Sequence, residues 1–263
     1  MITTHFGLRL RPFGKDIPAT SLYLTNQHRT VLRRLTQTAT HGTHAALTGE
    51  VGVGKSTLLR ALYDTLPGAR HTCHYVGSDL PSRGILRAVA RGLGLAPYWL
   101  RADLIEQVQG AVTDQFEKAG RRTLLTIDES HLLKYPVLED LRLLTNFKVD
   151  SQPILSLLLV GQPPLRERLT LKAVEALTQR LEVQLVFEPL SRQETGEYLR
   201  HHLELAGATA PIFSGAAEDL VFDRTQGIPR RINQLALQCL EMTAERGEKL
   251  VDERLVELAV SLL

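Results

Sequence analysis

Between residues 44 and 187, short apolar runs alternate with segments whose apolar residues recur at helical spacing. The apolar runs, which we take as strands, are 44–48, 71–77, 123–128, 154–161 and 181–187. The segments with helical periodicity between them include 83–94, 104–119 and 137–147. Short apolar strands separated by helices are typical of a parallel sheet covered on both faces. We therefore predict an α/β fold built on a parallel five-stranded sheet.

The pattern changes on both sides of this region. Residues 1–24 contain two prolines and two glycines and indicate an irregular N-terminal segment, which an amphipathic helix over 25–40 follows. After Pro189 the strand signals stop, and the helical segments are 191–207, 214–225, 230–246 and 251–262. The first of these opens with Ser191 and Glu194, the spacing of a capping box. We predict an α/β domain over 1–187 and a small helical lid domain over 188–263.

Composition narrows the class of protein. The chain has 263 residues, 43% hydrophobic and 23% charged, with a net charge of +2, as in an ordinary globular protein. Binding to nucleic acid would therefore depend on a local patch and not on global charge. Cys73 and Cys239 lie far apart and suggest no disulfide framework. Without a signal peptide or a long apolar run, we expect a soluble cytoplasmic protein with no membrane partner.

The stretch GEVGVGKST carries the clearest chemistry. It fits G-x-x-x-x-G-K-[ST] between a predicted strand and a predicted helix, the context of a phosphate-binding loop. Glycines let backbone N–H groups surround the phosphates, Lys55 reaches the β- and γ-phosphates, and Ser56 can ligate Mg²⁺. We expect ATP and Mg²⁺ as cofactors. The candidate ATP-binding residues are Gly49, Glu50, Val51, Gly52, Val53, Gly54, Lys55, Ser56 and Thr57.

Two carboxylates end the strand predicted over 123–128. Asp128 and Glu129 lie at its C-terminal end, where ligands sit in open α/β sheets. Asp128 is expected to hold Mg²⁺ together with Ser56, and Glu129 to polarise the attacking water. A surface acidic pair is the structural alternative, which the phosphate loop upstream disfavours. The combination predicts an ATPase, with Lys55, Asp128 and Glu129 as catalytic residues.

Three further polar residues are candidates for sensing the γ-phosphate. Gln162 ends a third apolar strand, at a tip that would lie between Asp128 and the γ-phosphate, although a plain strand-to-turn exit has the same pattern. Arg180 precedes the last strand and could reach the nucleotide of a neighbouring subunit as an arginine finger, or be a solvated helix-end residue. In GIPRRINQL, Arg230 or Arg231 follows a sharp helix start at Pro229 and could fold back over the nucleotide.

Together these motifs resemble those of the AAA+ ATPases. The resemblance covers nearly the whole chain: a Walker A motif at 49–56, a Walker B motif at 124–129, a sensor-1-like Gln162, a finger-like Arg180 and a sensor-2-like GIPR at 227–230. It implies that the nucleotide lies between the α/β domain and the lid. It also implies that subunits assemble with themselves into rings or helical filaments, with Arg180 acting in trans.

Four stretches, FGLRLRPF, YLTNQHRTVLRRL, LTGEVGVGKSTLLRAL and LLVGQPPLRERL, are similar to the ATPase domain of the ExeA-type general secretion pathway proteins A. This branch also contains ATPases encoded beside transposases, akin to the TnsC, TniB and MuB transposition regulators. The secretion proteins continue into a membrane span, whereas this sequence stops after the lid at Leu263. That difference favours the transposition regulators.

The first functional hypothesis is therefore a regulator of DNA transposition. It would oligomerise on duplex DNA, recruit a transposase with a target-selection protein as a further candidate partner, and disassemble on ATP hydrolysis. Candidate DNA-contacting residues are Arg83, Lys134 and Lys148, each of which is more often simply solvated. The alternative is a secretion-pathway assembly ATPase that acts with a membrane partner. A nucleotide-dependent switch with another partner shares the same site residues.

Overall fold

The structure is a computed structural model, and it describes residues 2–14, 17–77, 82–147 and 153–261. By their contacts, the residues form two compact units. The sheet unit comprises Gln27–Gly49 and Thr57–Phe187, and the helical unit comprises Met1–Asn26, Glu50–Ser56 and Glu188–Leu263. Each unit buries its own hydrophobic core. The phosphate loop, Glu50–Ser56, thus groups by contacts with the helical unit.

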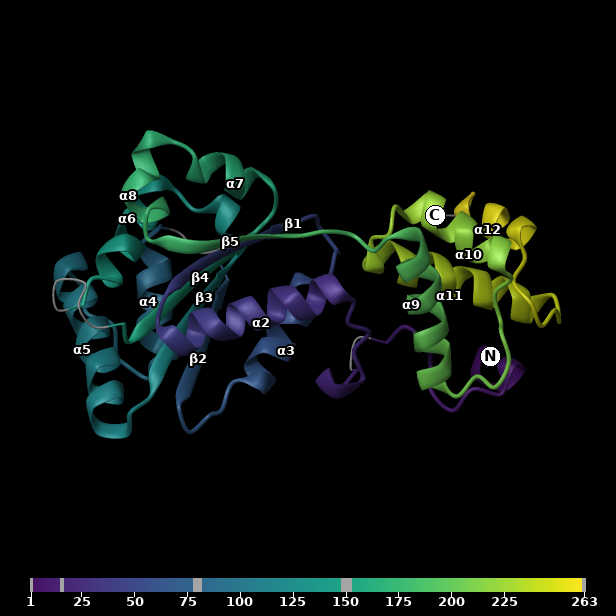
Figure 1. Cartoon of the computed structure of the whole chain (residues 1–263), viewed down its shortest axis with the longest axis horizontal. Helices are drawn as coiled ribbons and strands as arrows, with labels where there is room; N and C mark the ends of the chain where they lie inside the picture. The colour runs from purple at the N-terminus through teal and green to yellow at the C-terminus, as the bar shows by residue number, and fades with distance from the viewer. Residues whose placement is uncertain (1, 15–16, 78–81, 148–152, 262–263) are drawn as a thin grey trace. The chain divides into compact units, whose positions relative to one another are not determined.

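The sheet unit is built on five parallel strands (Figure 1). They are β1 (His44–Gly49), β2 (His71–Gly77), β3 (Arg122–Asp128), β4 (Leu155–Gly161) and β5 (Leu181–Phe187). Their order across the sheet is β2-β3-β4-β1-β5. The predicted parallel five-stranded sheet is confirmed. All of β4 and nearly all of β1 and β3 are buried, which explains their continuous apolar sequences.

Helices precede and connect the strands. They are α2 (Asn26–His41), α3 (Lys55–Thr65), α4 (Ser82–Gly92), α5 (Arg101–Ala119), α6 (Tyr135–Leu144), α7 (Pro164–Leu169) and α8 (Glu175–Thr178), with short 3₁₀ turns at Ser130–Leu132 and Lys172–Val174. The step from β1 to β2 runs across the sheet in the opposite direction to the later steps. Because such connections are right-handed, α3 covers one face of the sheet, and α5 and α6 cover the other.

The helical unit consists mainly of α9 (Arg192–Ala206), α10 (Gly215–Thr225), α11 (Pro229–Glu245) and α12 (Glu253–Val260). The capping box predicted for the first of these helices is confirmed. The Ser191 hydroxyl accepts a hydrogen bond from the Glu194 amide, and the Glu194 carboxylate accepts one from the Ser191 amide. Among the residues described, no helix has both the length and the apolar character that crossing a membrane requires.

The N-terminal segment differs from the prediction of an irregular chain. It contains helix α1 (Ile2–Phe6) and a 3₁₀ turn at Ala19–Ser21. The amide of Arg9 donates a 2.7 Å hydrogen bond to the carbonyl oxygen of Ala206, and Leu8 and Phe13 are buried in the core of the helical unit. The prolines and glycines of this segment predict an irregular chain. Tertiary contacts, and not local propensity, give the segment its ordered structure.

Candidate functional site

The phosphate loop begins where β1 ends. Thr48 of β1 pairs in register with Gly161 of β4, so the C-terminal ends of these strands meet at one edge of the sheet. Within the loop, Gly52 and Gly54 have φ angles of 82° and 108°, conformations that residues with a Cβ atom rarely adopt. The glycines of the motif thus allow the tight turn that precedes α3.

Lys55 is the first residue of α3 and is only 8% exposed. Its Nζ donates a 2.8 Å hydrogen bond to the carbonyl oxygen of Glu50, so the loop's own backbone holds the ammonium group. A buried cation at the N-terminus of a helix favours an anion at the same place. The adjacent Ser56 is exposed, which leaves its hydroxyl accessible to a metal ion. These residues fit a phosphate group with its Mg²⁺.

The helical unit brings Arg230 to this loop. The amide of Arg230 donates a 3.2 Å hydrogen bond to the carbonyl oxygen of Gly52, and a Cβ atom on Gly52 would lie 2.8 Å from the Cβ of Arg230. The exposed Arg230 side chain therefore starts beside the loop. Arg231 is also exposed, but its amide bonds to the carbonyl oxygen of Ile228 within the same turn. Of the two arginines, Arg230 is the one whose backbone contacts the phosphate loop.

In the sheet unit, Asp128 ends β3 with a buried side chain that is 5% exposed. One of its carboxylate oxygens accepts a 2.6 Å hydrogen bond from the Tyr75 hydroxyl, and the other accepts a 2.8 Å bond from the Glu129 amide. Partial burial and the bond to Asp128 raise the pKa of Tyr75, which therefore stays a donor. Asp128 is thus held in one orientation, as a metal-binding carboxylate requires.

Glu129 has a φ angle of 51°, the left-handed conformation that is unfavourable for residues other than glycine and is concentrated at functional sites. Its carboxylate accepts a 3.2 Å hydrogen bond from the Gln162 side-chain amide. The Nδ1 atom of His131 lies 3.5 Å from the same carboxylate oxygen and accepts a 3.4 Å bond from the Gln162 backbone amide. The structure therefore brings Glu129 and Gln162 together, as neighbours of the buried Asp128.

Sequence reasoning missed three supporting residues. His131 was not among the candidate residues, yet its ring contacts both Glu129 and Gln162. Arg168 of α7 donates hydrogen bonds to the carbonyl oxygens of His131 and Leu133 and so holds the segment after the carboxylates. For Tyr75 a signal existed. It lies two residues before Gly77, the register partner of Asp128, and residues two apart share one face of a sheet.

The proposed arginine finger and the three candidate DNA-contacting residues have no described contact with the phosphate loop or with the two carboxylates. Arg180 is half-buried and donates a 3.2 Å hydrogen bond to the Thr145 hydroxyl, beside α6 of its own chain. Lys134 is exposed immediately before α6. Arg83 belongs to α4, but its side chain is not among the described features, and Lys148 lies outside the described residues. No common surface for the three DNA candidates follows from these positions.

Comparison with known proteins bears on this site. Residues 37–169, which include the phosphate loop and both carboxylates, match the AAA domain family. The chain is 34% identical over 251 residues to general secretion pathway protein A of Aeromonas hydrophila. That similarity covers 94% of this chain but 46% of the relative, so the chain spans about half the length of the curated relative it matches.

Several solved structures share the fold of this chain. The ORC2 protein of Aeropyrum pernix, in ADPNP–ADP complexes, has a TM-score of 0.69 at 18% identity, over 95% of this chain and 70% of the other. The ORC1 protein of Aeropyrum pernix in complex with DNA has a TM-score of 0.67 at 19% identity, over 94% and 68%. At such identities the likeness concerns the fold alone. The family is shown by the match over residues 37–169, which is half of the chain: the chain belongs to the AAA domain family of AAA+ ATPases.

Proposed function

We propose that the chain binds ATP with Mg²⁺ and hydrolyses it as an assembly switch. The observation that carries this is the buried Lys55 ammonium, held inside a glycine loop at a helix N-terminus. In this proposal Gly49, Glu50, Val51, Gly52, Val53, Gly54 and Thr57 surround the phosphates together with Lys55. Ser56 and Asp128 would hold Mg²⁺, which when bound neutralises developing charge on the phosphates.

Hydrolysis needs a base and a sensor of the γ-phosphate. Glu129 is the proposed base that orients and polarises the attacking water. Gln162, now bonded to Glu129, would position the same water or the γ-phosphate, and Arg230 would read the nucleotide from the start of α11. Arg180 would act on the nucleotide of a neighbouring copy, for which it must leave Thr145. The proposed domains are the α/β domain over 1–187 and the helical lid over 188–263.

The proposed setting is duplex DNA during transposition, where the assembled protein would recruit a transposase and, with it, a target-selection protein. Support comes from the structural neighbour solved in complex with DNA and from the resemblance to transposition regulators. A net charge of +2 gives each copy a small electrostatic footprint, which assembly would multiply. Arg83, Lys134 and Lys148 remain the proposed contacts to phosphates.

The second candidate function is that of an assembly ATPase in a secretion pathway, with a membrane protein as partner. The 34% identity to general secretion pathway protein A favours it specifically. Both functions use the same nucleotide site, so they differ only in what the assembled protein binds.

The test is binding of labelled duplex DNA by the protein loaded with a non-hydrolysable ATP analogue, at low salt and then at rising salt. We expect binding that weakens steeply with salt and that Lys55→Ala abolishes, because it removes nucleotide binding. Lys118→Ala, which changes an exposed lysine paired with Asp114 on α5, is the matched control. No binding to DNA even at low salt would overturn the transposition role and leave the secretion role standing.

A further inference from the structure

An exposed aromatic loop joins α4 to α5 in the sheet unit. Tyr98, Trp99 and Leu100 are 56%, 81% and 62% exposed. The loop is nevertheless braced by Gln107 of α5. Its side-chain oxygen accepts a 3.1 Å hydrogen bond from the Tyr98 amide, and its side-chain amide donates a 2.8 Å bond to the carbonyl oxygen of Ala96. The fold therefore presents these apolar side chains to solvent in a fixed arrangement.

Arg87 of α4 completes this surface. Its guanidinium lies 4.8 Å from the centre of the Trp99 ring, a cation–π contact that further fixes the indole. We call Arg87, Tyr98, Trp99 and Leu100 the aromatic knob. Tryptophan, tyrosine and arginine are the residues enriched at the energetic centres of protein interfaces, and pre-organised side chains lose little entropy on binding. The knob thus has the composition of an interface anchor.

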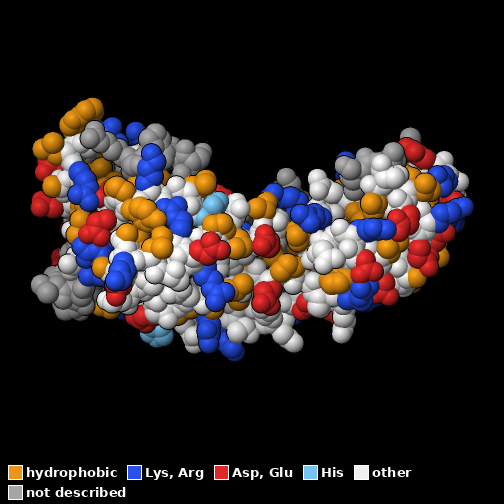
Figure 2. Space-filling model, turned by 90° about the horizontal axis from the view of Figure 1, so that it is seen from above, with side chains coloured by type: hydrophobic (Ala, Val, Ile, Leu, Met, Phe, Trp, Pro, Cys, Tyr) orange, Lys and Arg blue, Asp and Glu red, His pale blue; other side chains and the backbone are white. Residues whose placement is uncertain are grey.

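The charges around the knob favour a protein partner. Exposed Arg91 and Arg101 are balanced by exposed Asp103 and Glu106, and Arg101 pairs with Asp140. Over the face that Figure 2 shows, Lys and Arg are interspersed with Asp and Glu. Nucleic acid and anionic lipid both select a surface with excess positive charge, which this balance does not supply.

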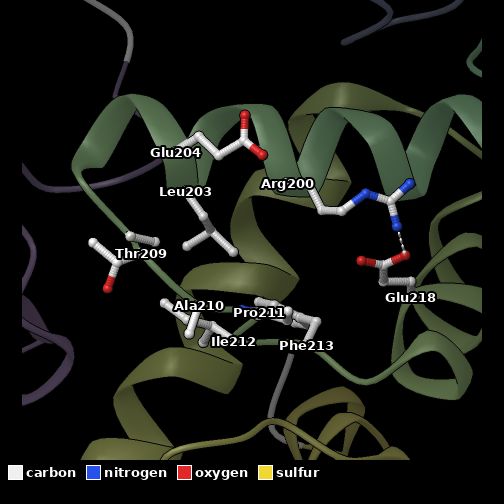
Figure 3. A pocket seen from close by; sticks show the side chains of 10 residues that line it. Arg200, Leu203, Glu204, Thr209, Ala210, Pro211, Ile212, Phe213 and Glu218 are labelled. Carbon is white, nitrogen blue, oxygen red and sulfur yellow. Dashed lines mark hydrogen bonds and ion pairs between the residues drawn. The ribbon is translucent and has the colours of Figure 1, made fainter.

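The helical unit holds a pocket of complementary character (Figure 3). It has a volume of about 160 Å³ and lies between α9 and the segment that leads to α10. Leu203, Ile212 and Phe213 form its apolar lining, and Glu204 and Glu218 contribute carboxylates. Glu218 pairs with Arg200 at 2.6 Å, whereas Glu204 is exposed. The pocket therefore suits an apolar group that carries a cation beside it.

We infer that the aromatic knob of one copy seats in this pocket of a second copy, with Arg87 facing Glu204. The knob and the pocket are different surfaces, so the contact is heterologous and repeats from copy to copy as a ring or a filament. Burial of an indole supplies a large apolar area, and the arginine and the glutamate fix its orientation. This inference rests on the proposed self-assembly and names the contact that carries it.

The first test measures assembly with the non-hydrolysable ATP analogue by mass photometry over a range of protein concentrations. Trp99→Ala is expected to raise the concentration for half-assembly about 30-fold, as loss of an interface hot spot does. Leu171→Ala, an exposed leucine outside the knob, should leave assembly unchanged. Affinity for a fluorescent ATP analogue should be the same in all three proteins, because the knob is not part of the nucleotide site.

The second test exchanges charges. Arg87→Glu and Glu204→Arg should each weaken assembly, and the double variant should recover most of it. If wild-type protein does not assemble, the proposed function fails and this inference with it. If wild-type protein assembles and Trp99→Ala assembles equally well, only this inference is overturned. It is also overturned if Trp99→Ala assembles normally but loses binding to duplex DNA or to anionic vesicles, since the knob would then serve those partners.

Discussion

The backbone amide of Arg230 donates a 3.2 Å hydrogen bond to the carbonyl oxygen of Gly52. This bond ties the first turn of α11 to the middle of the phosphate loop, two parts of the sequence separated by nearly 180 residues. A change in the conformation of the loop would therefore directly displace the start of α11.

Gly52→Ala should weaken nucleotide binding by at least about 10-fold. The new Cβ would lie 2.8 Å from the Cβ of Arg230, and the φ angle of 82° disfavours alanine, so the loop must shift. Titration with a fluorescent ATP analogue measures the change. Gly110→Ala, on α5, where an added Cβ meets nothing within 4 Å, is the control and should bind like wild type. Unchanged affinity of Gly52→Ala would show that the loop geometry does not control binding.

Gly227→Ala should destabilise the protein by at least about 2 kcal/mol. An added Cβ would lie 1.9 Å from the carbonyl oxygen of Leu190, and Gly227 has a φ angle of 68°. Its carbonyl oxygen also accepts a hydrogen bond from the Leu190 amide, which the shift would break. Urea unfolding followed by circular dichroism tests this. Gly215→Ala, in open space at the start of α10, should change the free energy of unfolding by less than about 0.5 kcal/mol.

Glu129→Gln should lower the rate of ATP hydrolysis by about 100-fold or more while ATP still binds, because the amide cannot act as a base. The assembled, ATP-bound state should therefore accumulate. Phosphate release and size-exclusion chromatography with ATP measure the two effects. Glu139→Gln, at an exposed position of α6, is a control that should hydrolyse ATP normally. A Glu129→Gln protein with wild-type turnover would assign the base elsewhere.

Arg180→Ala should reduce hydrolysis only where hydrolysis depends on assembly. Thr145→Val removes the hydroxyl that Arg180 contacts within its own chain but keeps the guanidinium. It should therefore retain activity if Arg180 acts on a neighbouring copy. ATPase activity measured against protein concentration distinguishes a role of Arg180 in a neighbouring copy from a role within its own chain. Arg180→Ala activity that still rises to the wild-type level would contradict the role in trans.

The stability of the helical unit should depend on pH through His202. This residue is 6% exposed, and its ring stacks on Phe13 and contacts the tilted ring of Tyr198. Burial, with a smaller contribution from His201, lowers the pKa of His202 to about 4 from 6.5. The neutral ring is favoured in the fold, so its contribution is complete above pH 6.5 and is lost as the pH falls towards 4. The total is about 3 kcal/mol.

His202→Phe should flatten this part of the dependence of unfolding free energy on pH. Urea unfolding at several values between pH 4 and pH 7 measures the slope. His41→Gln, exposed at the end of α2, should keep the wild-type slope. An unchanged slope in His202→Phe would mean that the ring is solvated in the folded protein.

Periodicity and short motifs were enough to predict the strands, most helices and the phosphate loop from the sequence. A short continuous apolar run such as 155–161, with turn residues on both sides, is typical of a strand buried on both faces, so local sequence was enough to predict it. The same holds for the Ser191 cap, whose partners lie three residues apart. The order of the N-terminal segment was not predictable, because Leu8 and Phe13 are ordered by contacts with residues about 190 positions away.

The sequence by itself therefore determined the fold class, the family and the residue types of a candidate nucleotide site, since each depends on patterns within a few residues. Only the tertiary structure decided which side chains surround the carboxylates. Tyr75 meets Asp128 because β2 pairs with β3, and His131 meets Gln162 because β3 pairs with β4. It also brought Gly52 against Arg230, and it exposed the braced Trp99 on one unit and a Glu204-lined pocket on the other. Such contacts join segments that are distant in the sequence, so local propensity cannot predict them.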